Sequence, residues 1–317
     1  MQWCDLPDPL VVIVGPTAVG KTEISLRLAE ALGAEIISAD SRLFYRGMDI
    51  GTAKPSREER ARVPHHLIDV CNPDETWSLA AFQAAAQEAI ANVHRRSRLP
   101  LLVGGTGQYI RAVIEGWTAP PQEPDQKLRQ VLEKWAGEIG AGELHRRLAI
   151  LDPVAAARIL PGNLRRTVRA LEVIFSTGKR FDDQRKKLGS AYSLLIIGLR
   201  RPRAEIYQRV DARIEQMLAD GLLEEVRNLL LHGYSAQLPT MSAIGYREMA
   251  AYLEGKMTLT DAIAAMKSLT HQYVRRQANW FKESDPKIHW FDAGTDCLAE
   301  ILSLIQSCES WIPKGQP

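Results

Sequence analysis

The stretch GPTAVGKT, residues 15–22, decides the fold class of this chain. It fits the pattern G-x-x-x-x-G-K-[ST], in which the backbone N–H groups of a glycine-rich loop surround a phosphate. The apolar run LVVIV, residues 10–14, precedes it and is typical of a buried parallel strand. A helical apolar pattern follows and stops at Gly33. A strand, a glycine loop and a helix in this order predict a phosphate site at the end of a buried strand.

The alternation of strands and helices continues along the chain. Further strands are expected at 34–40, 65–70, 99–105 and 192–200, with a last edge strand at 287–291. Helices are expected over 78–95, after Gly107, around 206–217, 246–253 and 263–280, and over 298–305. This order favours an α/β fold with a parallel sheet like that of P-loop nucleotide kinases. Ligands bind at the carboxyl ends of such strands, where the phosphate loop, Asp40 and Gly104–Gly107 are expected to meet.

Residues 118–190 interrupt this alternation. They follow a proline-rich break, WTAPPQEPD, and are helical and polar. We interpret 118–190 as a helical insertion in a catalytic core made of 1–117 and 191–317. The whole chain has a net charge of +2, but residues 161–190 carry eight Lys and Arg against three Asp and Glu. Such a basic block is either a binding surface for a polyanion or a solvated helix face.

Composition sets broad limits on the class of protein. The chain has 317 residues, of which 45% are hydrophobic and 25% charged, as in ordinary globular proteins. The apolar run near the start is too short for a signal peptide or a membrane span. The four cysteines are scattered without metal-type spacing and are typical of reduced thiols. We therefore expect a cytoplasmic protein with no membrane association.

The phosphate loop suggests several reactions. Lys21 is expected to reach the outer phosphate, and the Thr22 hydroxyl to bind Mg²⁺. A kinase usually also needs a carboxylate at the end of a neighbouring strand, and the strand LPLLVGG ends without one. Asp40 is the acid in a suitable position, where it could hold a metal or act as a general base. A small-molecule kinase and a non-catalytic RNA-binding protein both remain possible at this point.

Eight segments, taken in order, narrow the choice of protein family. They are GPTAVGKT, ISADSRLFYRGMDIGTAKP, HHLIDV, LLVGGTGQYIRAV, DPVAAARI, RALEV, IGYREM and RRQANWF. Together they resemble the bacterial tRNA dimethylallyltransferases, the isopentenyl-tRNA transferase family, from about residue 10 to residue 290. The segment DSRLFYRGMDIGTAKP is the most specific of them, because a phosphate loop alone is shared by many families.

The resemblance implies a reaction and its substrates. It implies transfer of a dimethylallyl group from dimethylallyl diphosphate to N6 of the adenosine 3′ of the anticodon, in tRNAs that read codons beginning with U. It implies Mg²⁺ as cofactor, with Thr22 as its protein ligand. It implies catalytic roles for Asp40 as general base, Thr106 on the adenine and Lys21 on the diphosphate. The predicted diphosphate site comprises Gly15, Pro16, Thr17, Ala18, Val19, Gly20, Lys21, Thr22 and Arg213.

The resemblance also assigns the insertion to the anticodon stem-loop of tRNA. The predicted tRNA-binding residues are Asp40, Ser41, Arg42, Leu43, Thr106, Arg129, Leu164, Arg165, Arg166, Thr167 and Arg169. Arg169 could equally pair with Glu172 on a helix face. The chain departs from the usual family pattern at Gly162, His271 and Asn279, which puts individual contacts there in doubt. A monomer is expected.

Overall fold

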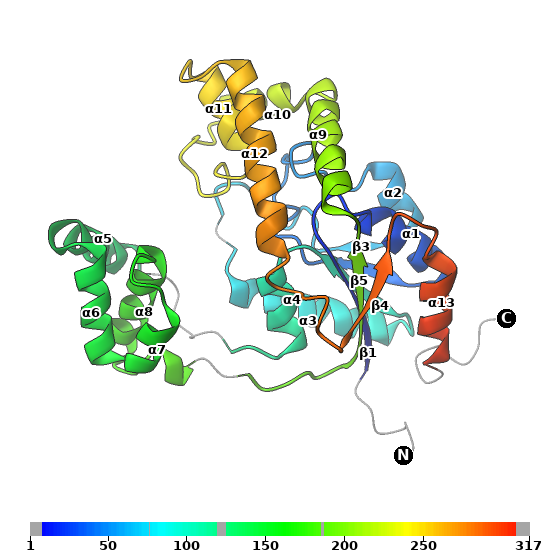
Figure 1. The fold of residues 1–317 in the computed structure, drawn as a ribbon, viewed down its shortest axis with the longest axis horizontal. Helices are drawn as coiled ribbons and strands as arrows, with labels where there is room; N and C mark the ends of the chain where they lie inside the picture. The colour runs from blue at the N-terminus through cyan, green and yellow to red at the C-terminus, as the bar shows by residue number, and fades with distance from the viewer. Residues whose placement is uncertain (1–7, 76, 119–124, 185–186, 309–317) are drawn as a thin grey trace. The chain divides into compact units, whose positions relative to one another are not determined.

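The computed structural model describes residues 8–75, 77–118, 125–184 and 187–308 (Figure 1). Contacts divide the chain into two compact units, Met1–Ile114 with Ser190–Pro317, and Glu115–Gly189. Most of the proline-rich break, and two residues of the basic block, Arg185 and Lys186, lie outside the described residues.

The first unit is built on a six-stranded sheet in the order β3-β2-β4-β1-β5-β6. The strands are β1 (Pro9–Val14), β2 (Glu35–Ser38), β3 (His65–His66), β4 (Pro100–Gly104), β5 (Ser193–Arg200) and β6 (Ile288–Asp292). Every neighbouring pair is parallel. The predicted α/β class with a parallel sheet is confirmed, and β6 is an edge strand as expected.

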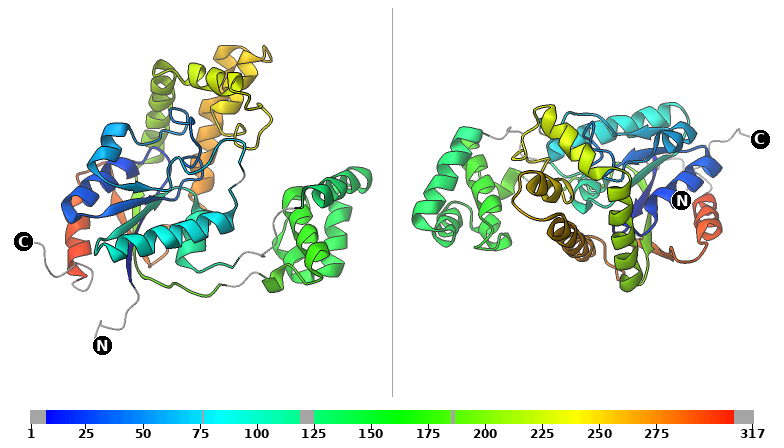
Figure 2. Two further views of the ribbon diagram at one scale, coloured as in Figure 1. Left: turned by 180° about the vertical axis from the view of Figure 1, so that it is seen from behind. Right: turned by 90° about the horizontal axis from the view of Figure 1, so that it is seen from above.

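Helices cover both faces of this sheet (Figures 1 and 2). They are α1 (Lys21–Leu32), α2 (Arg57–Arg62), α3 (Leu79–Arg95), α4 (Gly107–Ile114), α9 (Arg203–Ala219), α10 (Leu222–Leu231), α11 (Tyr246–Leu253), α12 (Leu259–Gln277) and α13 (Leu298–Ser307). Alternate residues of β1 point to opposite faces. Leu10 and Val12 pack with α3, α4 and the helices from α9 to α12, whereas Val11 and Ile13 pack with α1 and α13. The sheet is therefore buried on both sides, which explains the continuous apolar run of β1.

Two expectations about local structure are wrong. The strand predicted over 65–70 ends at His66, because Leu67 and Asp69 have left-handed backbone conformations, with φ of 61° and 57°. The helix predicted over 263–280 ends at Gln277, and Trp280 lies in the turn beyond it. Helices α2 and α10 were not expected. The amphipathic pattern of α10 runs on from α9 and is separated from it by Gly221, whose φ is 100°.

The second unit has a hydrophobic core of its own. Its helices are α5 (Gln126–Ile139), α6 (Ala141–Leu151), α7 (Pro153–Arg158) and α8 (Leu164–Thr177), followed by the short 3₁₀ helix η2 (Asp182–Gln184). Buried Leu132, Leu144, Leu148, Val168 and Leu171 pack together between them. The two ends of the unit are joined by backbone hydrogen bonds, from Leu188 N to Gly116 O (3.1 Å) and from Gly189 N to Glu115 O (3.2 Å).

Among the helices that the structure describes, none combines the length and the apolar character that a membrane crossing requires.

Candidate active site

The phosphate loop connects β1 to α1 and is held in a fixed shape by the surrounding chain. Gly15 lies so close to β5 that a Cβ atom there would be 2.7 Å from Leu199 O. The N-cap of α1 is Gly20, whose φ of 115° suits glycine. Lys21 Nζ donates to the carbonyl oxygens of Gly15 (3.0 Å) and Pro16 (2.8 Å). The local sequence therefore builds a helix N-terminus and a lysine into one anion-binding loop.

Two arginines that follow β5 in the chain donate hydrogen bonds to backbone carbonyl oxygens of this loop. Arg209 Nε donates to Ala18 O (2.8 Å), and Arg201 Nε donates to Val19 O (2.9 Å). These bonds use carbonyl oxygens only, so the two arginines occupy none of the N–H groups of the loop. Neither arginine was predicted to support the loop.

Lys21, Asp40 and Arg213 form a charge cluster beside the phosphate loop. Burial lowers the pKa of the Lys21 ammonium to about 8, while Asp40 raises it and Arg213 lowers it further. Burial also lowers the pKa of Arg213, and Asp40 opposes that change. The cluster holds two cationic side chains against one carboxylate. It is therefore suited to a ligand that carries several negative charges.

Asp40 lies at the end of β2 in a turn that fixes its carboxylate. Asp40 Oδ1 accepts a hydrogen bond from Arg42 N (3.0 Å). Among the described residues, no donor reaches Oδ2, so this oxygen can accept a proton from a ligand. Thr106, after β4, is adjacent, because its Oγ1 accepts from Ser41 N (3.3 Å). The structure therefore brings together Lys21, Asp40, Ser41, Thr106 and Arg213, which are far apart in the sequence.

Aromatic side chains form an apolar wall near this carboxylate. Tyr109 stacks on Phe82, with ring centroids 4.5 Å apart, and on Phe44, at 5.9 Å. Phe44 and Phe82 are fully buried. Burial raises the pKa of Tyr109 to about 12, where nearby Tyr45 adds to the rise, Arg42 opposes it and Asp40 adds to it. These rings belong to the hydrophobic core of the first unit, and Tyr109, which is only partly buried, is on the side of the core that is near Asp40.

The last turns of α12 contribute two site residues that sequence reasoning missed. Burial raises the pKa of Tyr273 to about 12; the charge of Asp40 adds to this, and hydrogen bonds with Thr106 and Gln277 oppose it. Gln277 is buried and contacts the phosphate loop. The available signal was the segment YVRRQ, residues 273–277, in which a glutamine is four residues after a tyrosine and so lies on the same helix face.

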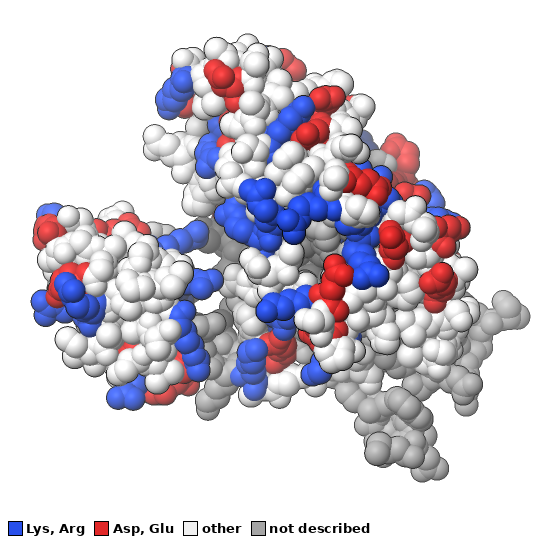
Figure 3. Space-filling view, in the orientation of Figure 1, with Lys and Arg blue, Asp and Glu red and all other residues white. Residues whose placement is uncertain are grey.

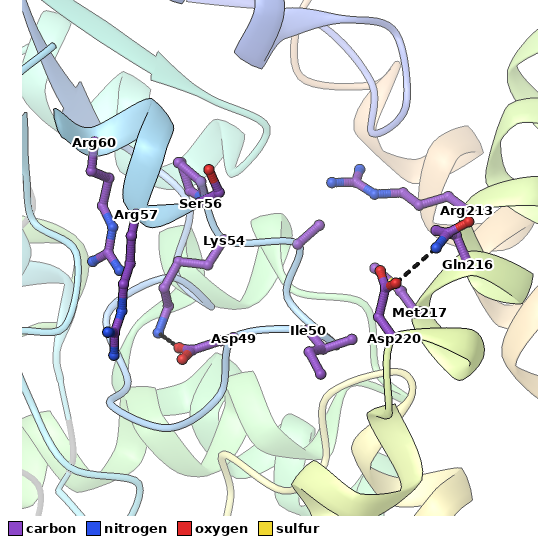
Figure 4. A pocket seen from close by; sticks show the side chains of 12 residues that line it. Asp49, Ile50, Lys54, Ser56, Arg57, Arg60, Arg213, Gln216, Met217 and Asp220 are labelled. Atoms are coloured by element: carbon purple, nitrogen blue, oxygen red, sulfur yellow. Dashed lines mark hydrogen bonds and ion pairs between the residues drawn. The ribbon is translucent and has the colours of Figure 1, made fainter. Parts of the chain in front are cut away.

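The segment DSRLFYRGMDIGTAKP, which is most specific for the family, forms a loop whose backbone is hydrogen-bonded to a side chain of α10. Glu225 accepts hydrogen bonds from the backbone N–H groups of Asp49 (2.9 Å), Ile50 (2.7 Å) and Gly51 (3.1 Å), and from the Tyr246 hydroxyl. Between this loop and α9 lies a pocket of about 390 Å³, into which Arg213 points (Figure 4). Arg213 therefore borders this pocket, and it is also close enough to Lys21 to lower the pKa of that ammonium.

A second concave site, of about 470 Å³, adjoins the phosphate loop at Gly15, Pro16 and Gly105. Its rim is basic and includes Arg200, Arg203, Arg275 and Lys282. Lys and Arg side chains gather in the same region over α12 and the start of α9 (Figure 3).

In the second unit, the predicted RNA-binding residues fall into two groups. Arg165 and Arg166 are exposed in the first turn of α8, and neither guanidinium forms an ion pair with another described residue. Arg129 and Arg169 instead pair with Glu172, at 2.9 and 3.1 Å. Glu172 is 1% exposed, so both arginines compensate a buried charge.

Thr167 and Leu164 complete the predicted set on α8. Thr167 is fully buried, and its hydroxyl donates to Asn163 O (3.2 Å). A side chain in this position is not accessible to RNA in this structure. Leu164 is half-buried and packs against the core of the unit.

Comparisons with known proteins cover nearly the whole chain. The model of the IPP transferase family matches residues 43–284, and that of the isopentenyl transferases matches residues 9–71. A tRNA dimethylallyltransferase of Roseiflexus sp. (strain RS-1) is 54% identical over 86% of this chain and 90% of its own length. One from Herpetosiphon aurantiacus is 46% identical over 94% and 95%.

Two solved structures that resemble this chain are also tRNA-prenylating transferases. The full-length tRNA isopentenylpyrophosphate transferase of Bacillus halodurans aligns with a TM-score of 0.71 at 43% identity, covering 95% of this chain and 96% of that one. A eukaryotic dimethylallyltransferase acting on tRNA aligns with a TM-score of 0.82 at 27% identity, covering 98% of this chain and 81% of that one.

Proposed function

The chain belongs to the IPP transferase family of tRNA dimethylallyltransferases, and on that premise we propose that it prenylates tRNA with dimethylallyl diphosphate as donor. The acceptor is N6 of the adenosine on the 3′ side of the anticodon, in tRNAs that read codons beginning with U. The product is N6-isopentenyladenosine. The observation that supports this most strongly is the cluster of Lys21, Asp40 and Arg213, where an anion-binding loop meets a carboxylate whose Oδ2 accepts no hydrogen bond from the residues that the structure describes.

The donor half of the site matches a leaving diphosphate. The bond between C1 of the prenyl group and the bridging oxygen breaks, and the diphosphate departs with the electron pair. The N–H groups of the phosphate loop, Lys21 and Arg213 stabilise the negative charge that develops there. Tyr109, which stacks on the buried Phe44, would give the site an apolar side near Asp40 that helps to keep water from the allylic carbon, which water would otherwise capture.

The acceptor half of the site, around Asp40 and Thr106, suits an adenine that is unstacked from its neighbours. A base in an anticodon loop can be turned into a pocket at low cost, because it is not paired. Thr106, which lies beside Ser41 and Asp40, would hydrogen-bond the adenine. N6 forms the new bond to C1 and transfers one proton to Oδ2 of Asp40, while Oδ1 stays bound to Arg42 N. The proton and the electron pair are both accounted for.

Magnesium fits the donors around the phosphate loop. The Thr22 side chain is exposed at the start of α1. In the residues that the structure describes, no group of three His, Cys, Asp or Glu could hold a metal alone. Mg²⁺ typically binds substrate phosphates, waters and few protein oxygens, so Thr22 with a diphosphate is an appropriate donor set. When bound, the ion would neutralise charge on the diphosphate.

We propose that the exposed Arg165 and Arg166 of α8 bind tRNA phosphates. Neutralising Arg165 and Arg166 together, as Arg165→Gln/Arg166→Gln, should lower the slope of log K against log[salt] for tRNA by about two units at most, because each lost phosphate contact removes about one released counterion. The measurement is tRNA affinity at several salt concentrations.

The matched control for this prediction is Arg146→Gln/Arg147→Gln. It removes the same charge from the same unit, but at arginines that pair with Glu143. Equal slopes for wild type and the Arg165/Arg166 variant would mean that this face of α8 is only solvated.

The direct test is mass spectrometry of anticodon-loop nucleosides after incubation of the protein with dimethylallyl diphosphate, Mg²⁺ and unmodified tRNA. We expect N6-isopentenyladenosine at the position 3′ of the anticodon. A parallel incubation with labelled ATP tests the rival reaction. Steady phosphoryl transfer without prenylated adenosine would replace this proposal with a kinase.

We further propose that the protein acts in the cytoplasm and as a monomer. The free thiols of Cys71, Cys297 and Cys308 suit a reducing compartment.

A further inference from the structure

Gln277 joins two loops that come from different strands. Its Oε1 accepts a hydrogen bond from Thr17 N (2.9 Å) in the phosphate loop after β1. Its Nε2 donates to Gly105 O (3.0 Å) in the turn after β4. One partner is a donor and the other an acceptor, so the orientation of the amide is determined by its contacts. The side chain is only 7% exposed.

The contact with the second loop is very close. A Cβ atom on Gly105 would be 2.4 Å from Gln277 Nε2, so only glycine lets the amide approach this far. The amide therefore acts as a spacer of fixed length between the phosphate loop and the Gly105–Thr106 turn.

The preceding turn of the same helix extends this connection to the acceptor side. Tyr273 is four residues before Gln277 and so lies on the same face of α12. Its hydroxyl lies near the side chains of Thr106 and Gln277, which oppose the rise in its pKa that burial causes. Thr106 Oγ1 in turn accepts from Ser41 N, next to Asp40. Gln277 thus bonds the phosphate loop to the Gly105–Thr106 turn, and Thr106 accepts from Ser41 N beside Asp40, so two sets of hydrogen bonds and one peptide bond connect the two sides of the site.

We propose that Gln277 is a positioning residue that sets the separation between the diphosphate site and the adenine site. This inference rests on the proposed function. The allylic carbon must leave the diphosphate and meet N6 along one line, and a displacement of about 1 Å in such an arrangement costs about 100-fold in rate. Gln277 does not touch the reacting atoms. Its effect is expected in the rate of the chemical step rather than in the affinity for either substrate.

The test is Gln277→Met, which keeps the length of the side chain and removes both hydrogen bonds. We expect the single-turnover rate of prenyl transfer to fall by about 10–100-fold. The affinities for Mg²⁺–pyrophosphate and for unmodified tRNA should stay unchanged. The matched control is Gln272→Met on the exposed side of the same helix, which should leave the rate unchanged.

A second pair of variants tests the spacing itself. Gly105→Ala should lower the rate in the wild-type background, because the new methyl group displaces the amide of Gln277. In a Gln277→Ala background the methyl group has room, so the same change should have little further effect. The two changes should therefore be non-additive.

The outcomes separate this inference from the proposed function. Wild-type protein that does not prenylate tRNA overturns the proposed function. Active wild type together with a Gln277→Met variant of equal single-turnover rate overturns only the positioning role, even if the variant has a lower melting temperature. A loss of rate matched by an equal loss of pyrophosphate affinity also overturns it, because Gln277 would then be a binding residue.

Discussion

Asp40→Asn should lower the rate of prenyl transfer by about 10²–10⁴-fold, the usual contribution of a positioned acid or base. The amide has nearly the same shape as the carboxylate, and its oxygen can still accept from Arg42 N. Its NH₂ group cannot take the proton from N6, so the chemical step is affected while both substrates still bind. Single-turnover prenylation at neutral pH and ordinary Mg²⁺ measures the effect.

Two controls separate proton acceptance from other roles of Asp40. The charge of Asp40 raises the pKa of Lys21, so the affinity of the variant for pyrophosphate must be measured alongside its rate. If Asp40 chiefly holds Mg²⁺ through water, raised Mg²⁺ should restore much of the activity. A variant that prenylates at nearly the wild-type rate would disprove the general-base role.

Lys21→Ala should lower the rate by about 10²–10³-fold, the range seen when one preorganised charge-stabilising group is removed. The ammonium bonds to carbonyl oxygens of the phosphate loop, and in the proposed reaction it would pair with the negative charge that grows as the diphosphate leaves. tRNA affinity should barely change. Prenylation rate and tRNA binding, measured on the same preparation, test both statements.

Arg27→Ala is the matched control for Lys21→Ala. It removes a positive charge from the same helix at an exposed position, where Arg27 lies 3.6 Å from Asp296. This control should be as active as wild type. Loss of tRNA binding with normal turnover in Lys21→Ala would show that the loop does not hold the diphosphate.

The central strands β1, β4 and β5 could be predicted because each carries a continuous apolar run. Leu10–Val14 is buried on both faces, and burial on both faces leaves this signature in sequence. The phosphate loop adds a fixed spacing of glycines and a lysine. The strand at 65–70 was overestimated because the left-handed conformations of Leu67 and Asp69 are not encoded by a glycine or an asparagine.

The support around the site could not be predicted from local patterns. Gln277 and Glu225 contact loops 260 and about 175 positions away in the chain, so their roles depend on tertiary packing. The same holds for Glu172, which turns Arg129 and Arg169 into partners of a buried carboxylate. Local sequence suggested a helix-face pair for Arg169 but gave no sign of Arg129. The catalytic and RNA-binding roles of individual residues stay predictions.

The hydrogen bonds that join the two ends of the second unit have a consequence for how the chain folds. Central strand β1 must pair with both β4 and β5, and the insertion separates those two strands along the chain. Closing a longer flexible loop costs more conformational entropy, by about 0.6 kcal/mol for each doubling of its length. The backbone bonds between Glu115–Gly116 and Leu188–Gly189 make the folded insertion a closed loop with adjacent ends. An insertion that folds first therefore shortens the effective connection between β4 and β5 and reduces the entropy lost when β5 joins β1.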